Sequence, residues 1–296
     1  MRTPATAFAS LTDRNRTIAK KRWPMPTIPE RCGQRPRLRP RKSLGQAFLV
    51  SSRTAHALVA ALAAGPSDTV LEIGPGKGAL TFRLAGRVRR LVAVELDARL
   101  VRRLRQLLDP TVEVVEADFL KYDLSTLGQA RVIGNLPYNI SSQILFRLLD
   151  NTRYWTTAVL TTQREFAARV LAGAGSRDYA PLSVFVEMVC NREKLFDIPP
   201  KCFRPSPKVV STALRLSVRE SPRYMPDDTR LFRHVVKSAF AHRRKTLANN
   251  IAAGLGLSKD EAVGLLARAG IEPEARAEQV DLAGFAALYE AFRRER

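Results

Sequence analysis

The chain has 296 residues, enough for one large domain and a smaller one, and its 45% hydrophobic content is ordinary for a globular protein. No apolar run approaches the roughly 20 residues that span a bilayer, which excludes an integral membrane protein. The formal net charge of +21 favours a polyanionic partner such as nucleic acid, although biased arginine usage would also raise it. The three cysteines and three histidines are scattered, so we expect no metal site and a reducing compartment.

Residues 1–42 are predicted to form a basic arm without a fold of its own. They contain twelve Lys or Arg against two acidic residues, frequent prolines and no apolar periodicity. Such an arm could bind RNA, or residues 1–36 could be an organellar transit peptide. Alternatively, Met25 could be the true start of the protein. The sequence leaves these three interpretations open.

From residue 43 onward, predicted helices and strands alternate. The hydrophobic pattern indicates helices at 54–64, 80–85, 98–108 and 140–149, and strands at 69–73, 91–94, 112–115, 131–133 and 158–162. This alternation is typical of right-handed βαβ units, so we expect an α/β fold with a mostly parallel, doubly wound sheet.

The pattern changes after residue 163. Helices are predicted at 164–171 and 181–189, and two alternating strands at 193–198 and 209–218 are expected near one edge of the same sheet. From residue 227 to the end, apolar residues recur only at helical spacing. We therefore expect three parts: the basic arm of residues 1–42, a catalytic domain of residues 43–224, and a C-terminal all-helical domain of residues 225–296.

A glycine-rich loop follows the first of the alternating strands, at residues 70–79 (VLEIGPGKGA). Gly74 and Gly76 allow a tight turn and the close approach of a ligand to the backbone. Glu95 ends the next strand about twenty residues later, where an acid binds ribose hydroxyls. The pattern predicts a cofactor that contains adenosine. By itself it also fits a dinucleotide, so an NAD-dependent oxidoreductase remains an alternative.

Two features favour S-adenosyl-L-methionine over a dinucleotide. The spacing Glu72-x-Gly74-x-Gly76-x-Gly78 resembles the first motif of class I methyltransferases. Asp118 follows the third strand, where those enzymes hold the cofactor adenine, although an aspartate there could equally cap the next turn.

The residues Asn135, Leu136, Pro137 and Tyr138 follow the predicted strand 131–133, at the sheet edge where ligands bind in open α/β folds. The N6 amine of adenine is a poor nucleophile because its lone pair is delocalised into the ring. The Asn135 side chain and the carbonyl of Leu136 or Pro137 could accept its two hydrogens and aim that lone pair at a methyl donor. Pro137 makes the turn rigid, and Tyr138 offers a stacking face worth roughly 1–3 kcal/mol. This set predicts methylation of adenine N6 without a general base.

Together these motifs resemble the KsgA-type ribosomal RNA adenine dimethyltransferases, over about residues 37–294. The resemblance implies a Rossmann-like class I methyltransferase sheet followed by a small helical domain. Residues 45–49 (GQAFL) are similar to the family's Gly-Gln-(Asn/His)-Phe-Leu motif, which implies that Gln46, Ala47, Leu49 and Asn135 contact the cofactor. Ala47 departs from the usual Asn or His, so its contact would come from the backbone, or from Gln46 instead.

The resemblance continues toward the C-terminus. Residues 199–209 are similar to the family's proline-rich segment, which implies that Phe203 stacks on the other face of the target base, with core packing as the alternative. Residues 240–247 resemble a basic helix and residues 270–278 a closing motif. This implies that the cationic side chains of that helix contact RNA phosphates, with a solvated face as the alternative; these are Arg243, Arg244 and Lys245.

The implied substrate is a pair of adjacent adenines in the 3′-terminal hairpin loop of small-subunit (16S) rRNA within a pre-30S particle, each receiving two methyl groups. Bases in a hairpin loop are easier to extrude than bases in a duplex. We expect a monomer in the bacterial cytoplasm. Two rivals remain: an Erm-type methylase of large-subunit rRNA, and a nucleic-acid-binding protein similar to mitochondrial transcription factor B. Leu136 and the full C-terminal region argue against the first, and the intact Glu95, Asp118 and Asn135 against the second.

Overall fold

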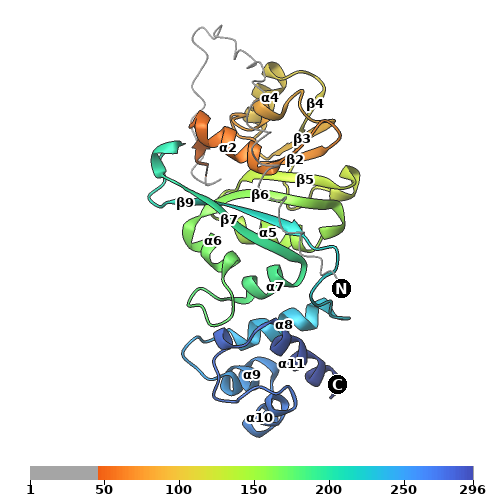
Figure 1. The fold of residues 1–296 in the computed structure, drawn as a ribbon, viewed down its shortest axis with the longest axis vertical. Coiled ribbons are helices and arrows are strands. Elements are labelled where there is room, and N and C mark those ends of the chain that lie inside the picture. The colour runs from red at the N-terminus through yellow and green to blue at the C-terminus, as the bar shows by residue number, and fades with distance from the viewer. Residues whose placement is uncertain (1–45, 296) are drawn as a thin grey trace, which may run out of the picture. The chain divides into compact units, whose positions relative to one another are not determined.

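The computed structural model describes residues 46–295 (Figure 1). Within these residues, seven strands form one large sheet, and two further short strands form a second. The predicted basic arm lies outside the described residues. The strands are β1 (Phe48–Leu49), β2 (Thr69–Ile73), β3 (Arg90–Glu95), β4 (Val112–Glu116), β5 (Ala130–Asn135), β6 (Trp155–Gln163), β7 (Cys190–Ile198), β8 (Phe203–Arg204) and β9 (Ser211–Val218). The α-helices are α2 (Ser52–Leu62), α3 (Thr81–Leu84), α4 (Ala98–Leu107), α5 (Ser141–Leu149), α6 (Arg164–Leu171), α7 (Pro181–Val189), α8 (Thr229–Ala239), α9 (Leu247–Leu255), α10 (Lys259–Arg268) and α11 (Leu282–Arg294).

The strand order of the large sheet is β4-β3-β2-β5-β6-β9-β7. The five strands from β4 to β6 are parallel, and β9 runs antiparallel to both β6 and β7. The chain moves outward from β2 to β4 and then crosses to the other side of β2 to form β5. This reversal opens a crevice at the carboxyl ends of β2 and β5, where ligands of doubly wound folds bind. The predicted mostly parallel sheet with an antiparallel strand near one edge is therefore confirmed.

Helices cover both faces of the sheet. Consecutive residues of a strand point to opposite faces, so neighbouring residues pack against different helices. Val70, Ile133 and Val159 pack in one apolar cluster with residues of α2, α3 and α4. Their neighbours in sequence, such as Leu71, pack in a second cluster on the other face with residues of α5, α6 and α7. Both the sheet and the helices on each face can be followed in Figure 1.

The C-terminal helices continue the second cluster without a break. Phe232 of α8 lies edge-on to Phe185 of α7, with ring centroids 6.3 Å apart, and to Tyr289 of α11 at 5.6 Å. Arg233 of α8 also forms an ion pair with Asp150, just after α5. The all-helical character of this region is confirmed. The described residues lie in one compact unit, so a domain boundary near residue 225 stays a prediction.

Most predicted elements occur close to their predicted positions. The strand at 69–73 and the helices at 164–171 and 181–189 have the predicted bounds. The first helix begins at Ser52 rather than at residue 54, because the Ser51 hydroxyl accepts a hydrogen bond from the Thr54 amide and caps it. The strand predicted from residue 193 begins at Cys190, directly after α7.

One predicted helix is wrong. The segment 240–247, which was expected to be a basic helix, is mainly a loop between α8 and α9. The Asn250 side chain donates hydrogen bonds to the carbonyls of Ala239 and His242, which holds the chain in a turn after α8. Thr246 then caps α9 through the Asn249 amide. Arg243, Arg244 and Lys245 therefore lie on this loop.

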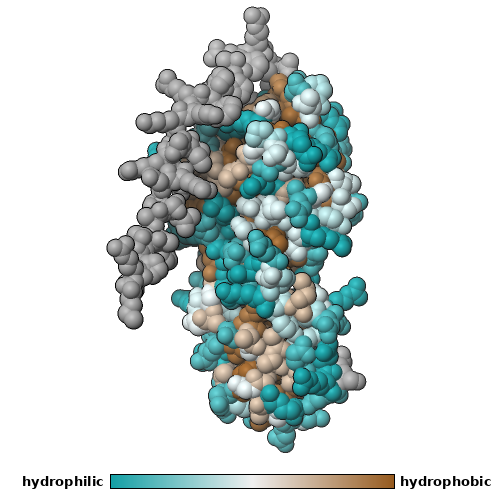
Figure 2. Space-filling model, turned by 45° about the vertical axis from the view of Figure 1, so that its right-hand side comes forward, coloured by the Kyte–Doolittle hydropathy of each residue, from teal (hydrophilic) through white to brown (hydrophobic). Residues whose placement is uncertain are grey.

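The outer surface of the described residues is mainly hydrophilic on the face shown in Figure 2, with apolar side chains in small separate groups. Within residues 46–295 there is no helix long and apolar enough to cross a membrane.

Candidate active site

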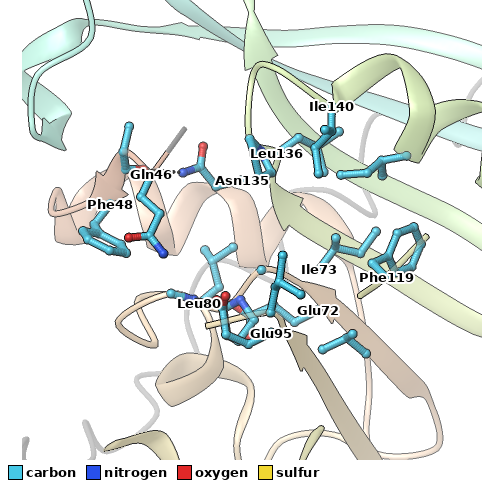
Figure 3. A pocket seen from close by; sticks show the side chains of 18 of the residues that line it. Gln46, Phe48, Glu72, Ile73, Leu80, Glu95, Phe119, Asn135, Leu136 and Ile140 are labelled. Carbon is cyan, nitrogen blue, oxygen red and sulfur yellow. Dashed lines mark hydrogen bonds between the residues drawn. The ribbon is translucent and has the colours of Figure 1, made fainter. Parts of the chain in front are cut away.

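A pocket lies in the crevice between the carboxyl ends of β2 and β5. Figure 3 shows Gln46 and Phe48 on one side of it, Asn135 and Leu136 on the side of β5, and the acidic side chains on the side of β2 and β3. The pocket brings together every predicted cofactor residue and all four residues of the reactive tetrapeptide: Gln46, Ala47, Leu49, Gly74, Gly76, Glu95, Asp118, Asn135, Leu136, Pro137 and Tyr138.

The glycine loop forms one wall through its backbone. Gly74 has a φ of +65° and Gly76 a φ of +58°, values that residues with side chains rarely adopt. A Cβ on Gly74 would project into open space, whereas one on Gly76 would come within 3.0 Å of the Phe48 ring. The Lys77 ammonium lies over the same ring, 4.8 Å from its centre. A side chain at position 76 would therefore collide with Phe48, whereas the space beside Gly74 is open for a ligand.

Glu95 at the end of β3 is fixed by two backbone amides. One carboxylate oxygen accepts a hydrogen bond from the Gly76 amide at 3.0 Å and the other from the Asp97 amide at 3.0 Å. Burial raises the pKa of this carboxyl, while those hydrogen bonds oppose the change. Each oxygen can accept a second hydrogen bond, so the carboxylate can still bind a pair of hydroxyls.

The Gln46 side chain lies over the same end of the pocket. Its amide donates to the Asp97 carboxylate at 3.2 Å, and Asp97 also caps α4 through the Arg99 amide. The Arg99 guanidinium holds the pKa of Asp97 well below its usual range. Because Asp97 stays ionised, Gln46 keeps a strong acceptor that joins the segment before β1 to the loop after β3.

Asp118 caps a turn and also lies at the pocket. One carboxylate oxygen accepts a hydrogen bond from the Leu120 amide at 2.9 Å, so the side chain caps the turn after β4. Asp118 also lines the pocket beside Phe119. Its contact with a cofactor adenine therefore stays a prediction.

Glu72 is a pocket residue that sequence reasoning missed, although it stands in the glycine motif. It lies next to the carboxyl end of β2, is only 1% exposed, and one of its carboxyl oxygens has no hydrogen-bond partner. Burial raises its pKa from 4.5 to about 8. Phe48 and Leu96 also line the pocket and were not singled out. For Leu96, the signal was an apolar residue directly after Glu95, the acid predicted to bind ribose; Leu96 is 52% exposed.

Asn135 is held in one orientation by a distant segment. Its side-chain nitrogen donates a hydrogen bond to the Ala47 carbonyl at 2.8 Å. The side-chain oxygen is buried and has no partner. Because the Ala47 carbonyl can only accept, the amide cannot turn over without losing this bond. The Ala47 backbone thus orients Asn135, although Ala47 lacks the polar side chain that is usual at this position in the family it resembles.

The rest of the tetrapeptide forms a tight turn into α5. The Leu136 amide donates to the Thr161 carbonyl at 2.9 Å. The Pro137 carbonyl accepts hydrogen bonds from the Ser141 hydroxyl and the Ile140 amide, at 2.9 and 3.2 Å. The Leu136 carbonyl, in contrast, accepts no hydrogen bond from residues 46–295. Of the two carbonyls considered from sequence, only that of Leu136 is free to accept one from a ligand.

Tyr138 is half-buried at the wall of the pocket, and its hydroxyl lies 2.7 Å from that of Ser211. Burial raises the pKa of this phenol, so the hydroxyl stays protonated at neutral pH. Phe203 does not meet the expectation that it presents a ring to the target base. Its side chain is 0% exposed and lies in the apolar cluster with Leu49 and Ile198, because β8 pairs with β1 and turns the ring inward. Core packing was the correct alternative.

The cationic side chains of the α8–α9 loop are all exposed. Arg243 donates a hydrogen bond to the carbonyl of Arg177, in the loop between α6 and α7. Arg244 and Lys245 form no ion pair within residues 46–295. The structure brings these three side chains together at the surface of the helical region, as expected, and leaves contact with RNA phosphates as a prediction.

The sheet order and the pocket at its reversal point define a class I methyltransferase, and comparisons with known proteins agree. The solved dimethyladenosine transferase from Plasmodium falciparum superimposes with a TM-score of 0.71 at 25% identity, covering 84% of this chain and 98% of that one. The 23S rRNA methyltransferase ErmE superimposes with a TM-score of 0.62 at 26% identity, covering 83% and 99%.

The sequence comparisons are more specific. A family model described as ribosomal RNA adenine dimethylase matches residues 37–293, and this chain belongs to that family. A ribosomal RNA small subunit methyltransferase A from Geobacter metallireducens is 45% identical over 263 residues, covering 86% of this chain and 96% of the relative. A protein of the same name from Methylococcus capsulatus is 40% identical, covering 84% and 96%.

Proposed function

We propose that this chain uses S-adenosyl-L-methionine to dimethylate the N6 amines of two adjacent adenines in the 3′-terminal hairpin loop of small-subunit rRNA. Membership of the rRNA adenine dimethylase family supports the reaction, and the names of the curated relatives support the small subunit as substrate. The single observation that carries the proposal is the buried, unpartnered side-chain oxygen of Asn135.

The residues that line the pocket fit the parts of S-adenosyl-L-methionine. Glu95 has acceptor capacity left for the ribose hydroxyls, and Gly74 leaves open space next to the backbone. Leu96 and Phe119 provide apolar surface for the adenine, with Asp118 beside them as an acceptor. S-adenosyl-L-methionine supplies an electrophilic methyl group when it is bound. The residues of the chain bind and orient it.

The target amine would be held by two fixed acceptors. The Asn135 side-chain oxygen and the Leu136 carbonyl each lack a partner within the described chain, and each can accept one N6 hydrogen. With both hydrogens bonded, the nitrogen lone pair is directed away from the ring and toward the methyl donor. These acceptors are already oriented before the reaction, so little reorganisation is needed in the transition state.

No general base is required in this scheme. The methylated aromatic ammonium is acidic and loses its proton readily to water. Tyr138 would hold the base by stacking. Its phenol is protonated at neutral pH and burial raises its pKa further, so it does not serve as the base.

The same proposal includes the partner and setting. Arg243, Arg244 and Lys245 would contact phosphates of the rRNA within a pre-30S particle. We further propose that the enzyme acts as a monomer in the bacterial cytoplasm, without a metal ion.

The test is transfer of labelled methyl groups to ribosomal subunits from cells that lack the modification. We expect label on 30S particles and none on 50S particles, because the Erm-type alternative targets the large subunit. Label confined to 50S particles would support that alternative, which the likeness to ErmE makes the natural comparison. RNA binding without transfer to either subunit would instead favour a nucleic-acid-binding protein.

A further inference from the structure

Ser211 lies outside the tetrapeptide 135–138, but its buried side chain contacts one of the four residues directly. Its hydroxyl lies 2.7 Å from the hydroxyl of Tyr138, although 73 residues separate the two in the sequence. Ser211 is 0% exposed, whereas Tyr138 is half-buried at the pocket. This hydrogen bond therefore holds the hydroxyl end of the Tyr138 side chain in place.

The backbone around Ser211 is rigid. Ser211 is the first residue of β9, and it pairs with Gln163 of β6 on one side and with Ile198 of β7 on the other. Tyr138, in contrast, lies on the turn between β5 and α5 and has no strand partner. A hydrogen bond between them ties a side chain on a loop to the middle of three paired strands. It also joins the target site to the proline-rich segment 199–209, which ends just before Ser211.

We propose that Ser211 is a positioning residue that fixes the Tyr138 ring as the stacking face for the target base. This inference rests on the proposed function, since it concerns the base that the enzyme methylates. Ser211 itself does not line the pocket, so its effect on the substrate passes through Tyr138.

The chemistry of the two hydroxyls suggests which variant leaves the fold intact. Ser211→Ala removes a fully buried hydroxyl, and the hydroxyl that it leaves without a partner belongs to Tyr138, a residue that is only half-buried at the pocket. Tyr138→Phe instead leaves the Ser211 hydroxyl buried without its partner, which is the costlier change. Ser211→Ala should therefore fold normally while its tyrosine ring gains rotational freedom.

The experiment is a double-mutant cycle on the single-turnover rate of methyl transfer to 30S particles, using wild type, Ser211→Ala, Tyr138→Phe and the double variant. We expect Ser211→Ala to lower the rate about three- to tenfold, the size of one hydrogen bond, and to leave the dissociation constant of S-adenosyl-L-methionine unchanged. In the Tyr138→Phe background, the same substitution should have no further effect. Ser217→Ala, six residues further along β9 and on the same face of the strand, is the matched control and should keep the wild-type rate.

Equal effects of Ser211→Ala in both backgrounds would overturn the inference, as would a wild-type rate for Ser211→Ala or a parallel loss of cofactor affinity. Because the cycle compares backgrounds, a general loss of stability in the single variant cannot imitate the expected coupling. Failure of the proposed function looks different: wild-type enzyme would then transfer no label to 30S particles at all, and both proposals would fall together.

Discussion

The two halves of the pocket are held in different ways. The cofactor half is shaped by backbone: Gly74 and Gly76 at positive φ, and Glu95 bonded to two amides. The target half is shaped by side chains that reach far along the chain, because Asn135 bonds to the Ala47 carbonyl and Tyr138 to the Ser211 hydroxyl. Backbone contacts within neighbouring strands are formed as the sheet folds. The target half of the pocket instead depends on two single side-chain hydrogen bonds to residues that are distant in the sequence.

This difference predicts separable effects of mutation. Changes in the cofactor half should alter cofactor affinity, and changes in the target half should alter the rate of transfer with cofactor affinity preserved. The predictions below test that separation, beginning with the largest expected effect.

Asn135→Ala should lower the transfer rate by at least about 10³-fold, the upper end for removing one preorganised polar group. It removes the acceptor for the target amine and the bond to Ala47, but Gln46 keeps its bond to Asp97, so cofactor affinity should change far less than the rate. Single-turnover transfer and calorimetric cofactor titration measure the two effects. Asn191→Ala, on an exposed position of β7, is the control. Retained turnover in Asn135→Ala would refute the role assigned to this side chain.

Tyr138→Ala should lower the transfer rate by about 10²-fold, because one base–aromatic stacking contact is lost. Tyr138→Phe should lower the rate only about three- to tenfold, because the ring face remains and only the hydrogen bond to Ser211 is lost. The rates are measured with saturating cofactor. The RNA dissociation constant, measured by filter binding, should change much less than the rate, because phosphate contacts dominate affinity. If RNA affinity fell as much as the rate did, Tyr138 would be a general RNA contact and not a base-positioning residue.

Gly76→Ala should weaken cofactor binding about tenfold, corresponding to about 1.4 kcal/mol. The new Cβ combines positive φ with a contact 3.0 Å from the Phe48 ring. Gly86→Ala is the matched control, because Gly86 has a φ of +71° and open space around its Cβ position. Equal effects of the two substitutions on cofactor affinity would mean that the narrow loop beside Phe48 is not required.

The sequence predicted the order of helices and strands well because each of these elements carries its own apolar pattern. β2 is buried along its whole length and β5 along most of it, as strands covered on both faces must be, and their apolar residues made both strands recognisable. Local patterns could not predict contacts across the chain. β1 and β8 are each two residues long and have no period to detect, and their pairing is what turns Phe203 into the core.

The same limit applies within the site. Asn135 and Tyr138 were identified from local chemistry, but their partners Ala47 and Ser211 are 88 and 73 residues away. Helical spacing could not locate the end of α8, because the side chain that fixes the following turn, Asn250, comes from α9. The three cationic residues were thus predicted correctly as exposed but placed on the wrong kind of element.

Glu72 should make the stability of the folded chain depend on pH. Burial raises its pKa from 4.5 to about 8, so within that window the folded chain keeps a proton that the unfolded chain has released. The free energy of unfolding therefore falls as pH rises from about 4.5 to 8, by at most about 1.4 kcal/mol per pH unit. Glu72→Gln removes this ionisation and should flatten the dependence of the melting temperature between pH 5 and pH 8.5. Identical pH profiles for wild type and variant would show that Glu72 does not hold the proton.

The central claim is that the target half of the pocket presents the N6 amine of adenine to a methyl donor. The most direct test is nucleoside mass spectrometry of small-subunit rRNA after complete reaction of unmethylated 30S particles with the enzyme and S-adenosyl-L-methionine. The account predicts N6,N6-dimethyladenosine at two adjacent positions of the 3′-terminal hairpin loop, and unmodified adenosine there with Asn135→Ala. Methylation of another base, or of a ribose hydroxyl, would contradict it.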